Sequence, residues 1–135
     1  MTEITAYPPG TFCWVDLASP DPGFAKSFYG AVLGWTAEDP YTDLGVPYTL
    51  LSYHGMHAGG IHPLSPGQGP TPYWLSYLSV RDVDATAERA VALGATIVMP
   101  AMDVMGEGRM CVIQDPTGAP VGFWQARAHP GAQID

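Results

Sequence analysis

Apolar and polar residues alternate along several short stretches of this chain, which is the pattern of half-buried β-strands. The alternation is clearest over residues 11–18, where Cys13, Val15 and Leu17 interleave with other residues, among them Trp14 and Asp16. A second clear stretch covers residues 73–80. Shorter runs of the same kind predict further strands at residues 35–38, 48–53, 56–64, 95–99, 109–114 and 120–126.

Two segments have the spacing and the end signals of helices instead. Asp21 and Asp82 each precede an apolar pattern of helical period, and aspartate is a favoured residue at the start of a helix. Gly34 and Gly94 offer the left-handed conformation that ends many helices. The sequence therefore predicts helices just after Asp21 and Asp82, each followed by a glycine stop.

The second half of the chain repeats the pattern of the first. Asp21, Gly34 and Gly60 correspond to Asp82, Gly94 and Gly122, each displaced by about sixty residues. We predict a single domain, residues 1–135, of α+β class, made of two βαβββ repeats at about 10–64 and 73–127. The Pro- and Gly-rich segment 65–72 is the predicted linker. Each repeat would have one face covered by its helix, so we expect the two curved mixed sheets to enclose a cavity.

Composition narrows the function classes. The chain is 47% hydrophobic and 11% aromatic, which suffices for a core, and its formal net charge of −8 disfavours nucleic acid and anionic membranes as partners. No apolar run reaches the length of a membrane span and no export leader is evident, so we expect a cytoplasmic protein. Cys13 and Cys111 form no framework and are predicted to be small buried residues.

Three motifs resemble the vicinal oxygen chelate superfamily, which includes glyoxalases, extradiol dioxygenases and bleomycin-resistance proteins. They are FYGAVLGW at 28–35, the segment 80–95 with VRDVDAT and AVALGA, and DPTGAPVGFW at 115–124. The resemblance covers residues from about 11 to 126 and implies the fold of two βαβββ repeats. It does not select one activity, because the superfamily carries several unrelated chemistries on one scaffold.

The resemblance also implies where metal-dependent members hold a divalent ion. The four corresponding positions here are Trp14, Gly60, Leu75 and Gly122, and none of these side chains is a metal ligand. We therefore predict a subgroup without the usual metal ligands, and no cofactor. An atypical ligand set from His54, His57 and His62 is the least favoured alternative, because in a strand His57 and His62 point to opposite faces.

Asp16 and His62 are the candidate catalytic residues. On the alignment that the resemblance implies, Asp16 is a carboxylate on a sheet lining the cavity, beside the indole of Trp14, and His62 faces the same cavity. Such groups serve as acids and bases for proton transfer. The alternative for Asp16 is a structural role, in which it accepts hydrogen bonds from a neighbouring strand or turn.

Trp14, Tyr77, Trp124 and Arg109 are the candidate ligand-binding residues. The three aromatic residues would form a wall around a pocket whose floor Gly60 and Gly122 keep open, which suits a flat ligand. The alternative is that these rings fill the core. Arg109, in the glycine-flanked segment 105–110, would hold a carboxylate or enolate at the cavity mouth, or else pair with Asp103 or Glu107 on the surface.

The leading functional hypothesis is metal-independent binding of a small, largely apolar or aromatic organic molecule, as in sequestration or resistance. The first alternative is a cofactor-free isomerase, cyclase or lyase that uses Asp16 or His62 for proton transfer. A metal-dependent glyoxalase-like or dioxygenase-like enzyme is the third. The expected partners are a small organic ligand and, since proteins of this fold commonly pair, a second copy of the chain.

Overall fold

The computed structural model describes residues 3–39, 47–64 and 71–134, and its elements confirm the predicted α+β class and the repeat. The first half runs β1 (Phe12–Ser19), α1 (Pro22–Leu33), β2 (Thr36–Glu38), β3 (Thr49–Tyr53) and β4 (Met56–Pro63). The second half runs β5 (Tyr73–Ser79), α2 (Val83–Ala92), β6 (Thr96–Val104), β7 (Gly108–Gln114) and β8 (Pro120–Ala126). Of the predicted linker, residues 65–70 lie outside the described residues.

Both helices begin and end where the sequence predicts. The carboxylate of Asp21 accepts a hydrogen bond from the Phe24 N–H at 3.0 Å, and that of Asp82 accepts one from the Ala85 N–H at 3.1 Å. Gly34, with φ of 73°, and Gly94, with φ of 104°, follow in the left-handed region. Neither described helix is long and apolar enough to cross a bilayer.

The described chain divides into two compact units that do not coincide with the repeats. The first contains Val15–Leu75 together with Met1–Ile4 and Ala132–Asp135, and the second contains Thr5–Trp14 and Ser76–Gly131. Strand β1 therefore starts in the second unit and ends in the first, whereas β5 starts in the first and ends in the second.

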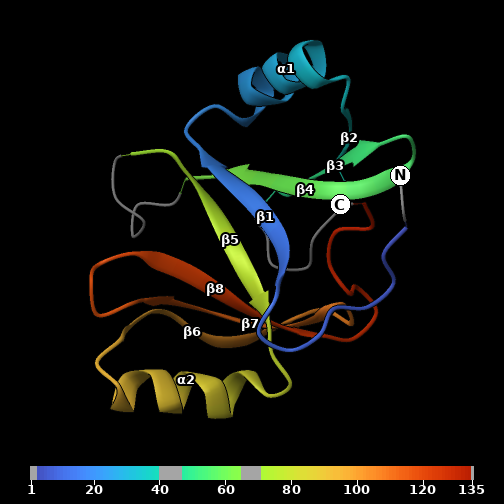
Figure 1. The fold of residues 1–135 in the computed structure, drawn as a ribbon. Helices are drawn as coiled ribbons and strands as arrows, with labels where there is room; N and C mark the ends of the chain where they lie inside the picture. Colours follow the sequence, from blue (N-terminus) through green and yellow to red (C-terminus); the bar gives the residue numbers. More distant parts are fainter. Residues whose placement is uncertain (1–2, 40–46, 65–70, 135) are drawn as a thin grey trace. The chain divides into compact units, whose positions relative to one another are not determined.

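In the first unit the strand order is β2-β3-β4-β1. Strand β4 runs antiparallel to β3 and parallel to β1, and Figure 1 shows β1 in blue beside β4 in green. In the β1–β4 pair, Asp16 stands opposite Gly60. Leu17, Leu51 and Ile61 form the core on the face toward α1. Helix α1 itself contains no buried residue. Because neighbouring residues of a strand point to opposite faces, Asp16 lies on the face away from this core.

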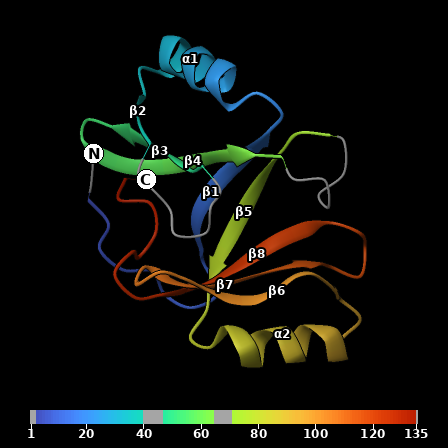
Figure 2. The same cartoon turned by 180° about the vertical axis from the view of Figure 1, so that it is seen from behind.

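The second unit has the corresponding order β5-β8-β7-β6. Helix α2, yellow in Figure 2, packs along β6 and β7, and its Val83 shares a buried cluster with Cys111, Ile113 and Phe123. Cys13 and Cys111 are buried free thiols as predicted, and burial raises the pKa of Cys13 to about 11. Strand β6 continues to Val104, beyond the predicted residues 95–99.

The structure corrects the expectation that Gly60 and Gly122 keep a cavity floor open. The phenol of Tyr48 lies against Gly60 where a Cβ would be, and the ring of Tyr77 lies in the same way against Gly122. Each glycine therefore leaves room for a tyrosine of its own unit rather than for a ligand. The cavity expected between the two sheets stays a prediction.

This packing makes Gly122 intolerant of a side chain. A Cβ at Gly122 would overlap the Tyr77 ring, which stands opposite it in the β5–β8 register, so Gly122→Ala should lower the free energy of unfolding by about 1–3 kcal/mol. Gly106→Ala is the control, since a Cβ there meets nothing within 4 Å, and it should change stability by less than about 1 kcal/mol. Urea unfolding of both variants measures the difference, and equal effects would show that the ring does not fill this position.

Candidate functional site

Among the described residues of the first unit, the most deeply buried carboxylate is that of Asp16 on β1. The residue is only 3% exposed. Its Oδ2 accepts a hydrogen bond from the Tyr48 hydroxyl at 3.2 Å, and its Oδ1 lies 3.6 Å from Nε2 of His62. A buried carboxylate is favoured where hydrogen-bond donors and positive charge surround it, and these two neighbours supply such contacts.

His62 on β4 lies beside Asp16, on the face that strand parity predicts for both residues. Its neighbour across the parallel β1–β4 pair is Ala18, two residues beyond Asp16, which places His62 and Asp16 on the same face. Its Nδ1 lies 3.0 Å from the Pro63 carbonyl oxygen, and because a carbonyl only accepts, this contact requires a proton on Nδ1. The imidazole side chain is 17% exposed, so it is the more accessible member of the pair.

Tyr48 is the residue of this site that sequence reasoning missed. Its ring lies nearly parallel to the His62 imidazole, with centroids 6.2 Å apart and an angle of 10° between the planes. The signal that could have found it is Gly60, whose missing side chain makes room for the phenol. Asp16, Tyr48 and His62 together form what we call the acid–base cluster.

The acid–base cluster favours the charged form of His62. Burial by itself lowers the pKa of His62, but the nearby carboxylate of Asp16 and the Pro63 carbonyl together raise this pKa above its ordinary value of 6.5. With a proton already on Nδ1, a second proton on Nε2 would face the carboxylate directly. The pair therefore takes up this second proton at a higher pH than an ordinary histidine does.

Trp14 and Trp124 lie together in the second unit, around a histidine that the sequence analysis did not single out. The ring of His129 stands edge-on to both indoles, with centroids 4.6 Å from Trp14 and 5.9 Å from Trp124. The Trp124 Nε1–H donates to the His129 carbonyl at 2.7 Å, and Gly131 packs against the Cys13 carbonyl. The segment after β8 thus covers both indoles, and Trp14 is 8% and Trp124 7% exposed. The role of these two residues in ligand binding stays a prediction.

Tyr77 and Arg109 also have contacts within the second unit. Tyr77 is 5% exposed and packs on Gly122. Arg109 lies inside β7 rather than in a loop, and its guanidinium donates two hydrogen bonds to Asp84, at 2.8 and 2.9 Å, and one to Asp103 at 3.3 Å. The ion pair with Asp103, predicted as the alternative role of Arg109, is therefore present. The pair with Asp84 was not predicted, because Asp84 lies on α2 and reaches Arg109 only through the packing of that helix. The ligand-binding roles of both residues stay predictions.

His54 and His57 do not join His62. His54 is exposed at the turn between β3 and β4, with φ of 50°, and His57 has its backbone N–H bonded to the Gln133 side chain at 2.8 Å. Within the described residues no three His, Cys, Asp or Glu side chains gather in a way that could hold a metal ion.

The four positions that the resemblance assigns to metal ligands do not fit a divalent ion. Trp14 and Leu75 offer no lone pair for coordination, and Gly60 and Gly122 offer no side chain. The space beside each glycine is filled by a tyrosine ring of the same unit.

Comparison with known proteins agrees with the fold. Residues 11–123 match the family model described as Glyoxalase/Bleomycin resistance protein/Dioxygenase superfamily. "Putative glyoxylase CFP32" of Mycobacterium bovis is 41% identical over 99% of this chain and 52% of its own length. "Anthracycline biosynthesis protein DauV" of Streptomyces sp. (strain C5) is 33% identical over 97% of this chain and 52% of its own length. The chain thus spans about half the length of the curated relatives it matches.

Among solved structures, methylmalonyl-CoA epimerase from Mycobacterium tuberculosis superposes with a TM-score of 0.61 and 22% sequence identity. The superposition covers 90% of this chain and 91% of the epimerase. At this level of identity the likeness establishes the arrangement of strands and helices and leaves the chemistry to be argued from the residues.

The contact between Asp16 and His62 predicts a specific pH behaviour. Asp16→Asn removes the charge that raises the pKa of His62, so an NMR titration should show this pKa falling. A histidine whose pKa is raised on folding stabilises the fold fully below its unfolded pKa, and this contribution disappears as pH rises through the folded pKa. The stability lost in Asp16→Asn should therefore be largest below about pH 6.5. An unchanged pKa of His62 would show that the carboxylate does not act on the ring.

Proposed function

Because the chain belongs to the glyoxalase/bleomycin resistance protein/dioxygenase superfamily, we propose that it binds a small organic molecule without a metal ion and moves a proton on it. The acid–base cluster of the first unit would carry this activity. The substrate class that suits it is a carbonyl compound with a removable proton on the neighbouring carbon. The reaction class is that of an isomerase, cyclase or lyase without a cofactor.

The observation that supports this proposal is a buried carboxylate beside Nε2 of a partly exposed imidazole. The side chain of Asp16 is 5% exposed, whereas that of His62 is 17% exposed. Nε2 and Oδ1 are 3.6 Å apart, so the negative charge of Asp16 acts directly on the imidazole. An oriented histidine supported by a carboxylate is the arrangement that general acid–base catalysis requires.

The proposed step conserves atoms and charge within the site. Neutral His62 removes a proton from the carbon beside the carbonyl, and the electron pair of the broken C–H bond moves to the carbonyl oxygen. Asp16 stabilises the resulting imidazolium, and Pro63 keeps Nδ1 protonated so that only Nε2 exchanges a proton. Returning the proton to a different atom of the enolate completes an isomerisation and restores neutral His62.

The names of two relatives favour a small organic substrate. One is named a glyoxylase and the other an anthracycline biosynthesis protein, and both align with nearly all of this chain. These proteins are about twice as long, so their names support the class of molecule and leave the individual substrate to experiment.

Binding without turnover is the second candidate. It is favoured by the fact that both oxygens of Asp16 already face groups of its own unit, Tyr48 and His62, as in a purely structural carboxylate. Sequestration of an organic molecule would need only the fold and an apolar surface. The two candidates differ in whether His62 exchanges a proton with the bound molecule.

Hydrogen exchange tests the proton transfer directly. The protein is incubated in D₂O with a panel of ketones, 2-oxo acids and acyl thioesters, and loss of the proton next to the carbonyl is followed by ¹H NMR. The wild type should accelerate exchange in at least one compound. His62→Gln should slow that exchange by about 100-fold or more, since general acid–base catalysis contributes this order of magnitude.

His54→Gln provides the matched control, because His54 lies on the same hairpin but is exposed. It should leave the exchange rate unchanged. Exchange that persists in both His62→Gln and Asp16→Asn would rule out the proposed step. A compound that binds the wild type and shows no exchange would support binding without turnover instead.

A further inference from the structure

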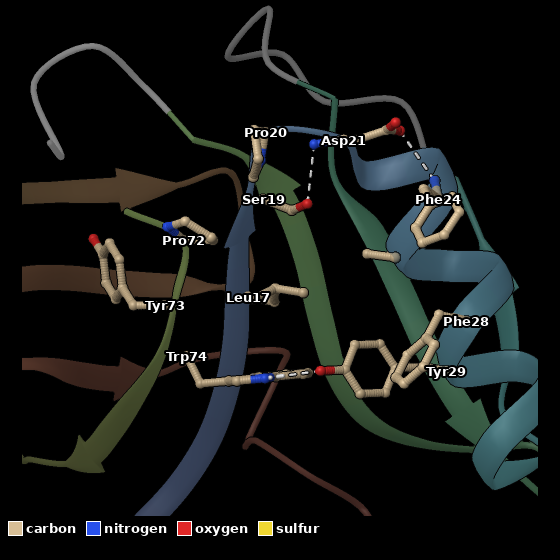
Figure 3. A pocket seen from close by; sticks show the side chains of 11 residues that line it. Leu17, Ser19, Pro20, Asp21, Phe24, Phe28, Tyr29, Pro72, Tyr73 and Trp74 are labelled. Atoms are coloured by element: carbon tan, nitrogen blue, oxygen red, sulfur yellow. Dashed lines mark hydrogen bonds between the residues drawn. The ribbon is translucent and has the colours of Figure 1, made fainter. Parts of the chain in front are cut away.

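A groove lined by aromatic rings lies on the other face of the first unit, beside α1. It has a volume of about 460 Å³ and is bounded by the end of β1, the start of α1 and the start of β5, as Figure 3 shows. Four rings line it on the side of α1, those of Phe24, Phe28, Tyr29 and Trp74, whereas the ring of Tyr73 turns to the other face of β5. Its size falls in the range of small-molecule sites, about 300–1,000 Å³.

The rings of Trp74 and Tyr29 contact each other, and the neighbouring rings of Phe28 and Phe24 are exposed. The indole Nε1–H of Trp74 donates to the Tyr29 hydroxyl at 3.3 Å, and the two rings meet edge-on with centroids 5.3 Å apart. Phe28 stands edge-on to Tyr29 at 5.0 Å and is 50% exposed. Phe24, also on α1, is 72% exposed. The groove therefore presents fixed aromatic surface to solvent, which costs free energy unless something covers it.

The charge at the groove is entirely negative. Among the described residues that line it, Asp21 is the only charged one, and none is a lysine or arginine. The carboxylate uses Oδ1 to accept from the Phe24 N–H, and Oδ2 accepts no hydrogen bond from any residue in the described ranges. The faces of aromatic rings carry negative potential and attract cations. The Asp21 carboxylate and the ring faces both attract positive charge, so the groove complements a cation, with the positive pole of the helix start acting against them.

We propose that this groove is a binding site for a planar aromatic cation. The ring system of the ligand lies against Trp74 and Phe28, and its positive group lies toward Asp21. The site is separate from the acid–base cluster, because Leu17 lines the groove while its neighbour Asp16 points to the opposite face of β1. The proposal does not depend on the proposed proton transfer.

Three probes of similar shape and different charge test it. The wild type is titrated with 9-aminoacridine, which is a cation at neutral pH, with neutral acridine and with anionic anthracene-9-carboxylate, each followed by fluorescence anisotropy. The cation should bind at least about tenfold more tightly than acridine, and the anion most weakly. Equal or tighter binding of acridine or of the anion would overturn the proposal without the use of any variant.

Asp21→Asn then assigns the binding to the groove. Asparagine caps a helix about as well as aspartate, so this change removes the charge and keeps the cap. The affinity for 9-aminoacridine should fall about tenfold, while that for acridine stays the same. The repeat supplies the control, since Asp82→Asn makes the same change at the start of α2 and should leave both affinities unchanged.

Two further variants locate the aromatic contact. Phe28→Leu keeps an apolar side chain at an exposed position and should weaken both 9-aminoacridine and acridine, and His62→Gln should weaken neither. Equal losses of affinity for the cation in Asp21→Asn and Asp82→Asn would point to the net negative charge of the whole protein. The groove would then be excluded as the binding site. Loss of binding in His62→Gln would instead place the probe at the acid–base cluster.

Discussion

The alternation of side chains along β1 is the constraint on which both sites of the first unit depend. Asp16 and Leu17 are neighbours in the chain, so the extended backbone sends them to opposite faces of the sheet. Leu17 joins the core beside α1, and Asp16 meets His62 and Tyr48 on the other face. A shift of one residue in the β1–β4 register would exchange these faces, burying the carboxylate in the apolar core.

Much of this arrangement could be predicted from sequence because it is local or periodic. Helix starts at Asp21 and Asp82 and the stops at Gly34 and Gly94 each depend on a few adjacent residues, and all four are confirmed. The approach of His62 to Asp16 follows from strand parity once the repeat is recognised. Parity also placed Trp74 on the face opposite Tyr77, although it could not show that rings from α1 would meet it.

The remaining features depend on contacts between distant segments. Tyr48 reaches Asp16 across 32 positions of sequence, and its fit against Gly60 is visible only once β3 and β4 are paired. Trp14 and Trp124 looked available for a ligand because nothing in their own strands shows that residues 127–131 fold back over them. Arg109 has several acidic residues within reach, and its choice of Asp84 depends on how α2 packs.

The tautomer of His62 tests the account of the acid–base cluster most directly. Long-range ¹H–¹⁵N NMR of the imidazole, recorded above the pKa of His62, shows which nitrogen keeps its proton. The account predicts a proton on Nδ1, held by the Pro63 carbonyl, and an unprotonated Nε2 toward Asp16. A neutral ring protonated on Nε2 would contradict it, because that nitrogen could then no longer accept a proton from a bound molecule.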